Sequence, residues 1–165
     1  MVSKNDRVDN IKMSDARIIF RNFSGKESRF NKAGSRNFCV VLDEELAKTL
    51  KADGWNVKEG RRNDDFDEPL RYLQVSVGFD YYPPKVYLIA GNAKNLLTEE
   101  TINTLDWADI EHVDLTIRPY IWEVNGKTGI KAYLKNMYVT VEDNEFDRKY
   151  GVDNQPFIDD DDTPF

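Results

Sequence analysis

Cysteine, histidine and long apolar runs are scarce in this chain of 165 residues. The single cysteine, Cys39, excludes an intramolecular disulfide, and its apolar surroundings at 38–42 predict a buried side chain rather than a reactive thiol. The single histidine, His112, has no second histidine or cysteine at zinc-ligand spacing, so a residue at a strand end is predicted. No apolar run is close to the length of a membrane-spanning helix, which is about 18 residues. No apolar N-terminal signal segment precedes the body. A soluble, cytoplasmic protein is therefore expected.

Motifs for common enzyme chemistries are also missing. The chain has no phosphate-binding P-loop and no Gly-rich dinucleotide turn, and its 127–129 segment, Lys-Thr-Gly, lacks an accompanying Ser-x-x-Lys. The acids Asp64, Asp65, Asp67 and Glu68 could hold a metal for nuclease chemistry, but they lie in one polar loop, where a solvated charge run is the simpler interpretation. The sequence thus predicts no enzyme, no cofactor and no metal site, with a metal-dependent nuclease as one alternative.

The negative charge is concentrated at the C-terminus. The net charge is −7, and residues 142–165 carry all of it, with nine acids against two bases. Residues 1–141 contain 21 acids and 21 bases, and residues 1–62 contain 14 bases against nine acids. Without its C-terminal segment the chain is a neutral body with a basic N-terminal half, which is compatible with a polyanionic ligand.

The last seven residues combine four consecutive acids with a terminal Pro-Phe. Such a composition cannot build a core, so residues 143–165 are predicted to form a disordered acidic tail. A phenyl ring beside the terminal carboxylate suits an apolar pocket surrounded by Lys or Arg on another protein. The predicted partner-binding residues of the tail are Asp159, Asp160, Asp161, Asp162, Pro164 and Phe165.

Alternating apolar residues predict an all-β body over residues 14–142, with one or two short helices and a flexible arm at 1–13. Strands are predicted at 16–23, 36–42, 72–79 and 85–90, with a short one at 55–58 and a charged loop at 60–69. A helix is predicted between Asp43 as N-cap and Gly54 as C-terminal stop, and a second short helix is predicted after Thr98.

The clearest local signal is a hairpin. Asn125-Gly126 separates two alternating runs at 112–124 and 127–141, and this dipeptide favours a two-residue turn. The turn fixes the register, which pairs Trp122 with Gly129, Tyr120 with Lys131, Arg118 with Tyr133 and Thr116 with Lys135. One face is then aliphatic and belongs to the core. The other carries three aromatics and three cations without an acid: Arg118, Tyr120, Trp122, Lys131, Tyr133 and Lys135.

Flat rings between cations suit a single nucleic-acid strand, whose bases stack while its phosphates are neutralised. The alternative is that the rings cover a second core layer and the lysine stems pack on them. A second basic and aromatic set follows the first strand, and Trp55 and Tyr82 are outer stacking candidates. That set is Arg21, Phe23, Lys26, Arg29, Phe30, Lys32 and Arg36. Arg61 and Arg62 could join it.

Two segments resemble single-stranded DNA-binding proteins. The tip Asp161-Asp162-Thr163-Pro164-Phe165 is similar to the bacterial pattern of Asp residues, one spacer, Pro and Phe, and Arg21 to Lys26 together with Arg36 to Phe38 resemble phage proteins of the T7-like group. The resemblance implies an OB-fold, a five-stranded, partly open Greek-key barrel. The departure from the family pattern is that the body lacks a strong positive charge.

The resemblance also implies a function. The protein would bind and protect single-stranded DNA without sequence specificity. It would do so in the replication, recombination and repair of a phage or prophage. The resemblance places it in the bacterial cytoplasm, with no membrane partner. The tail would recruit replication and recombination proteins and compete with DNA for the groove. The alternative is a phage structural or assembly protein that uses the aromatic hairpin face to bind another protein. Whether the chain is a homo-oligomer, and whether it prefers RNA or DNA, stays open.

We expect deletion of residues 153–165 to tighten binding to single-stranded DNA, because the acidic segment no longer competes for the cationic face. The affinity of either form should fall steeply with salt, since phosphate contacts release counterions. Fluorescence polarisation with a dT oligomer at two salt concentrations checks both points. Equal affinities of the deleted and full-length chains would contradict competition by the tail.

Overall fold

The computed structural model describes residues 7–60, 69–80 and 82–142. Within these residues the chain forms strands, one α-helix and one 3-10 helix, in agreement with the predicted all-β class. The elements are β1 (Ile11–Met13), β2 (Ile18–Asn22), β3 (Arg36–Leu42), α1 (Glu44–Asp53), β4 (Val57–Gly60), β5 (Leu70–Val77), β6 (Lys85–Ala90), β7 (Ala93–Leu97), the 3-10 helix η1 (Ile102–Asp106), β8 (Ile110–Val124) and β9 (Lys127–Val141).

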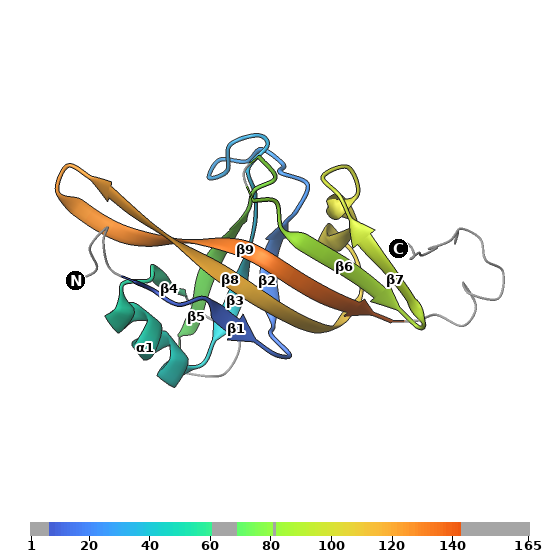
Figure 1. Ribbon diagram of the computed structural model, residues 1–165, viewed down its shortest axis with the longest axis horizontal. Coiled ribbons are helices and arrows are strands. Elements are labelled where there is room, and N and C mark those ends of the chain that lie inside the picture. Colours follow the sequence, from blue (N-terminus) through green and yellow to red (C-terminus); the bar gives the residue numbers. More distant parts are fainter. Residues whose placement is uncertain (1–6, 61–68, 81, 143–165) are drawn as a thin grey trace.

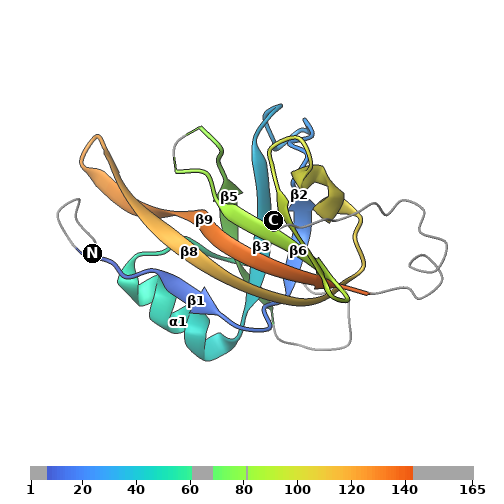
Figure 2. The same cartoon turned by 45° about the vertical axis from the view of Figure 1, so that its right-hand side comes forward.

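The strands form one curled sheet (Figures 1 and 2). Its main path is β1-β8-β9-β5-β3-β2, while β4 pairs with β5, and β6 pairs with both β7 and β9. The two ends of the path, β1 and β2, are consecutive in the chain, and at the corner between them Ala16 N donates to Val113 O at 2.8 Å. The result is the open barrel that the resemblance implies. It has nine strands rather than five because the first strand is split at this corner and because β4, β6 and β7 are added.

The β8–β9 hairpin crosses the whole molecule as one long twisted ribbon (Figure 1). Each strand has 15 residues, and the predicted register is confirmed from Val124–Lys127 through Ile117–Leu134. The predicted Thr116–Lys135 pair is wrong, because Thr116 pairs with Asn136 and the ladder shifts by one residue there. Lys135 is therefore the extra residue of a β-bulge, which bends and twists the strand.

The core lies on the inner face of this ribbon. Ile117, Ile130 and Leu134 are buried, as the alternation predicts for the aliphatic face, and Met137 and Val139 continue the buried row beyond the bulge. Because a strand turns alternate side chains to opposite faces, the same strands present their remaining residues outward. One element thus supplies both core and outer surface.

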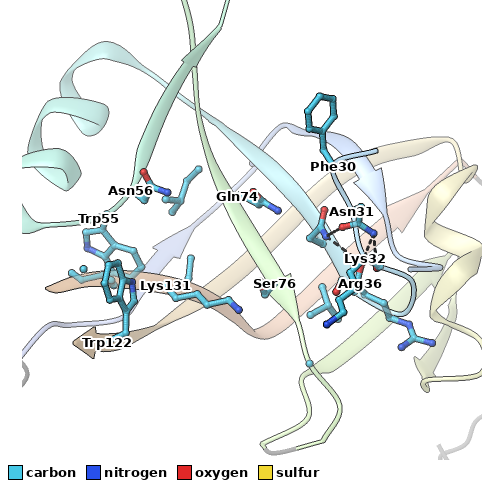
Figure 3. A pocket seen from close by; sticks show the side chains of 18 of the residues that line it. Phe30, Asn31, Lys32, Arg36, Trp55, Asn56, Gln74, Ser76, Trp122 and Lys131 are labelled. Carbon is cyan, nitrogen blue, oxygen red and sulfur yellow. Dashed lines mark hydrogen bonds between the residues drawn. The ribbon is translucent and has the colours of Figure 1, made fainter. Parts of the chain in front are cut away.

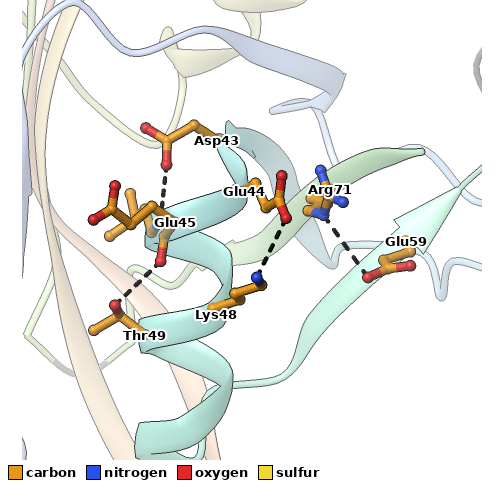
Figure 4. A network of polar contacts seen from close by, with 8 residues as sticks. Asp43, Glu44, Glu45, Lys48, Thr49, Glu59 and Arg71 are labelled. Atoms are coloured by element: carbon orange, nitrogen blue, oxygen red, sulfur yellow. Dashed lines mark hydrogen bonds and ion pairs between the residues drawn. The ribbon is translucent and has the colours of Figure 1, made fainter. Parts of the chain in front are cut away.

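Helix α1 forms as predicted and leads the chain back to the hairpin. The carboxylate of Asp43 accepts a hydrogen bond from Leu46 N at 2.8 Å, and Gly54 ends the helix at φ 106°. An i,i+4 ion pair joins Lys48 to Glu44 at 3.3 Å on its surface (Figure 4). The next residue, Trp55, forms a bridge with Ile130 of β9, so the helix ends against the hairpin.

The N-terminal part differs from the prediction in two places. The predicted flexible arm at 1–13 includes β1, which pairs with β8 and buries Ile11. The predicted strand at 16–23 is interrupted at Phe20, which has φ 51° and lies within a register shift between Ile19 and Asn22. Phe20 is therefore exposed and contacts the ring of Tyr72 edge-on at 5.5 Å, instead of facing the core with Ile18.

Two elements in the second half were also predicted inaccurately. The helix expected after Thr98 is the 3-10 helix η1, whose N-cap Thr101 makes no side-chain cap; its hydroxyl accepts a hydrogen bond from Thr98 N instead. Strand β7 was missed because the run 93–97 is short and alternates poorly. None of the described helices is long and apolar enough to cross a bilayer.

Burial predicts the behaviour of Cys39. Its desolvation raises the thiol pKa to about 11, with Lys58 opposing the shift. We expect no reaction with a disulfide reagent at pH 8 in the native state and rapid reaction after denaturation. The thiol has a pKa of about 8.5 in the unfolded chain. Cys39 therefore stabilises the folded state below that pH, and this contribution to the free energy of unfolding is lost as the pH rises toward 11. Fast native labelling at pH 8 would contradict the burial.

Candidate nucleic-acid interface

A groove lies between the tip of the β8–β9 hairpin and the surface of β3 and β5 (Figure 3). Its volume is about 840 Å³. The hairpin forms one wall, β5 provides the floor through Gln74 and Ser76, and the loop before β3 forms the far rim with Phe30 and Lys32.

Trp122 is the aromatic surface at the hairpin end of this groove. It is 37 % exposed, and it lies against Gly129, where a β-carbon would stand 2.5 Å from its Cζ2 atom. Only glycine therefore lets the indole lie flat on the neighbouring strand. Trp55 lines the same end but is 4 % exposed (Figure 3). The ring available to a ligand is that of Trp122.

The groove is positively charged. Its described lining residues include Lys32, Arg36 and Lys131 but no Asp or Glu. Figure 3 shows the Lys131 side chain extending along the groove from the hairpin. Gln74 and Asn56 add amide groups that can hydrogen-bond to base edges, and the Gln74 carbonyl oxygen accepts from Lys58 Nζ at 3.1 Å. Glu99 pairs with Arg36 from outside this lining, so Lys32 and Lys131 supply the positive charge that suits an anionic strand.

A second hollow, of about 430 Å³, adjoins the groove at Gly78, which lines both. The guanidinium of Arg118 lies 5.4 Å from the ring of Tyr82 and 5.2 Å from that of Tyr133, and Lys131 Nζ lies 5.0 Å from Tyr133. Tyr120 meets Tyr133 edge-to-face at 6.2 Å. These cation–π contacts hold rings and charges in alternation.

Tyr82 is presented in an unusual way. Its φ of 49° lies in the left-handed region, which is strained for a tyrosine, and its ring is exposed. Strained backbone positions cluster at functional sites, so Tyr82 is a candidate for contact with a ligand. Asp80 is the one carboxylate among the described residues that line this second hollow.

The far rim is braced from within the loop. Asn31 Nδ2 donates to the carbonyls of Lys26 at 2.9 Å and Ser35 at 3.0 Å, and its Oδ1 accepts from Asn37 Nδ2 at 2.8 Å. The loop thereby presents Phe30 at its tip, 90 % exposed, although a free phenyl ring in water is unfavourable. The guanidinium of Arg29 lies 5.6 Å from this ring, and the rest of the ring is open to a ligand.

The structure brings together most of the predicted binding residues. Those that line the groove or the adjoining hollow and are accessible are Phe30, Lys32, Arg36, Tyr82, Arg118, Tyr120, Trp122, Lys131 and Tyr133. Lys26 and Arg29 are exposed on the rim loop outside this lining, and Lys135 is exposed at the bulge. The predicted tail, residues 143–165, lies outside the described residues.

Three of the predicted residues do not present their side chains to the groove. Phe23 is fully buried and stacks on Phe38 at 5.1 Å, because it faces the core after the bulge in β2. Trp55 is buried beneath the hairpin and cannot stack on a base. Arg21 donates from one nitrogen to the carbonyls of Leu105 and Ala108, both at 2.9 Å, so it fixes η1 instead of facing the groove.

Arg36 remains a candidate with a structural contact. Its guanidinium pairs with Glu99 at 3.3 Å and lies 5.7 Å from the ring of Phe79. Its buried Nε has no hydrogen-bond partner among the described residues. Arg36 is therefore held in an ion pair at the edge of the groove, and a phosphate would have to compete with Glu99 for it.

Sequence reasoning missed the polar floor. Gln74 and Ser76 are outward-facing in the alternation of β5, and that alternation was the signal that could have identified them. Among residues 7–60, 69–80 and 82–142 no group of three or more His, Cys, Asp or Glu is arranged to hold a metal ion. Asp64, Asp65, Asp67 and Glu68, with Arg61 and Arg62, lie outside those ranges.

Known proteins resemble this chain in sequence family and in fold. The family model described as "Putative phage ssDNA-binding domain" matches residues 2–163. The single-stranded DNA-binding protein from bacteriophage Enc34, in complex with ssDNA, has a TM-score of 0.52 at 15 % identity, covering 83 % of this chain and 89 % of that one. A further structure of the Enc34 protein has a TM-score of 0.51 at 14 % identity, covering 93 % and 88 %. No curated protein matches the sequence significantly.

Gly129→Ala tests the seating of Trp122. The added β-carbon displaces the indole, so we expect its emission to shift to longer wavelength, with a change in unfolding free energy within about 1 kcal/mol. The Trp107→Phe background removes the other exposed indole. Gly78→Ala is the matched control, because a β-carbon there would be at an ordinary 3.8 Å from Tyr133. Unchanged emission in Gly129→Ala would contradict the contact.

Proposed function

The chain belongs to the family of phage single-stranded DNA-binding domains, and we propose that it binds single-stranded DNA without sequence specificity in the groove and hollow described above. The observation that carries the proposal is the flat, partly exposed Trp122 in a groove whose described lining has three cations and no acid. A single strand offers both partners, bases for the ring and phosphates for the cations.

The bases would stack in two places. Trp122 would hold a base at the hairpin end, and the alternating set of Tyr82, Arg118 and Tyr133 would hold others in the hollow. Phe30 would close over the strand from the far rim. Stacking tolerates every base because every base has a π-face, which accounts for the absence of sequence specificity.

The phosphates would meet Lys32, Arg36, Lys131 and Arg118. The ammonium of Lys131 now lies over the Tyr133 ring, and no carboxylate among the described residues holds it. It can therefore turn to a phosphate without breaking an ion pair. Lys26, Arg29 and Lys135 are exposed on either side and would add outer contacts.

In the cell the protein would cover single-stranded DNA during replication, recombination and repair of a phage or prophage, in the cytoplasm of the bacterial host. It would act without catalysis. The acidic segment ending in Pro164 and Phe165 would recruit replication or recombination proteins, since its charge and terminal ring can be read by a basic, apolar pocket on a partner.

Lys131→Gln tests the phosphate contact. We expect weaker binding to every dT oligomer and a slope of log affinity against log salt reduced by about 0.7, the value for one phosphate contact on a single strand. Tryptophan quenching by the oligomer measures both. Lys48→Gln is the matched control, because that ammonium already faces Glu44 on the surface of α1. It should leave affinity and slope unchanged.

The same titration can refute the proposal. No quenching of the wild-type chain by any dT oligomer would favour a protein-binding role for the hairpin face. Cleavage of the oligomer only when magnesium is added would favour a nuclease. An unchanged salt slope in Lys131→Gln would remove Lys131 from the interface.

A further inference from the structure

We propose that Tyr87, Tyr138 and Lys94 form a second platform for single-stranded DNA, which extends the path beyond the groove toward the end of β9. This inference rests on the proposed function and adds a site to it. The three residues lie on β6, β9 and β7, on the part of the sheet opposite the hairpin tip in Figure 1.

The platform has the same chemistry as the hollow. The rings of Tyr87 and Tyr138 lie 5.3 Å apart and are nearly parallel, at 11°. Lys94 Nζ lies 4.4 Å from the centre of the Tyr87 ring and 5.5 Å from that of Tyr138. Tyr138 is 39 % exposed, so a ring remains available for stacking.

The platform is continuous with the groove because one strand carries both. On β9, Tyr133 pairs with Arg118 on β8, and the bulge at Lys135 then shifts the ladder so that Tyr138 faces outward on the same side. Without the bulge, alternation would turn position 138 inward, since it is five residues from Tyr133. At about 3.3 Å per residue the two tyrosines are about 16 Å apart along the strand.

The charges between and around them favour a polyanion. Lys85 pairs with Asn136, so it lies between the hollow and the platform, and Lys135 is exposed at the bulge. Lys94 has no carboxylate partner within the described part of the chain, and its ammonium lies over the two rings. Three cations thus accompany the path of the strand.

The carboxylates of Asp114 and Asp15, which both contact His112, oppose them. Asp114 pairs with Tyr138 on the β8 side, where its Oδ1 accepts from Asp15 N at 2.9 Å and lies 2.9 Å from His112 Nε2. These contacts hold the charge toward the β1 corner. The DNA backbone should therefore pass on the opposite side of Tyr138, over β6 and β7, where Lys85 and Lys94 lie.

A purely structural role is the competing explanation. A stacked cross-strand pair with a cation over it stabilises a sheet whether or not DNA binds. The two explanations differ in one measurable respect. A structural pair affects oligomers of all lengths alike, whereas a second platform affects only those long enough to reach it.

The test is a length series of labelled dT oligomers, from about 4 to 16 nucleotides, the range of site sizes for this kind of fold. Full-length wild-type chain is compared with Tyr138→Thr, Tyr138→Phe and Lys94→Gln, with one protein per oligomer verified by native mass spectrometry. Trp107→Thr is the control, as an exposed aromatic that is outside both sites.

We expect wild-type affinity to keep rising at lengths where Tyr138→Thr has reached its plateau, with a final difference of at least about fivefold. Tyr138→Phe should keep the gain because its ring is retained. Lys94→Gln should lose part of it, and it still tests the platform if Tyr138→Thr is poorly folded. The short oligomers should bind equally to all variants.

Identical length profiles for wild type, Tyr138→Thr and Lys94→Gln would overturn the platform and leave the groove intact. An equal loss at every length would also overturn it, in favour of the structural role. If wild-type chain binds no oligomer of any length, the proposed function itself fails, and the platform fails with it.

Discussion

The structure depends on the strict alternation of side chains along the β8–β9 hairpin. A two-residue turn at Asn125-Gly126 sets the register, and that register buries Ile117, Ile130 and Leu134 while it turns their neighbours outward. A slip by one residue would exchange the two faces, exposing the core and burying the cations. The energy that folds the barrel therefore also fixes the outer face on which the proposed function rests.

Local signals predicted much of this arrangement. The hairpin turn, the caps of α1 and the run 36–42 follow from short-range chemistry, and each was predicted close to its observed position. The pairing of Trp122 with Gly129 could be predicted from the sequence, because it lies three residues from the turn, where an error in register has not accumulated. The exposed hairpin face follows from the same reasoning.

Several of the errors have a common physical origin in backbone irregularities. The bulge at Lys135 and the left-handed φ of Phe20 each change the face of the sheet on which the following residues lie. Neither position is a glycine, so the sequence gives no signal of the irregularity. Phe23 and Arg21 were misassigned for this reason. Phe23 packs on Phe38 in the core, and Arg21 donates a hydrogen bond to η1, although their residue types suit a nucleic-acid contact. The distance between segments such as β6 and β9 is likewise set by tertiary pairing, so Tyr87 and Tyr138 could not be linked from the sequence.

We propose that a single strand lies on the outward face of the β8–β9 hairpin. Photo-cross-linking of a halogenated dT oligomer to the full chain, followed by mass spectrometry of the peptides, measures this contact directly. We expect adducts on Trp122 and Tyr133, and on Phe30 across the groove. Adducts confined to α1 or β1, with none on the β8–β9 hairpin, would contradict it.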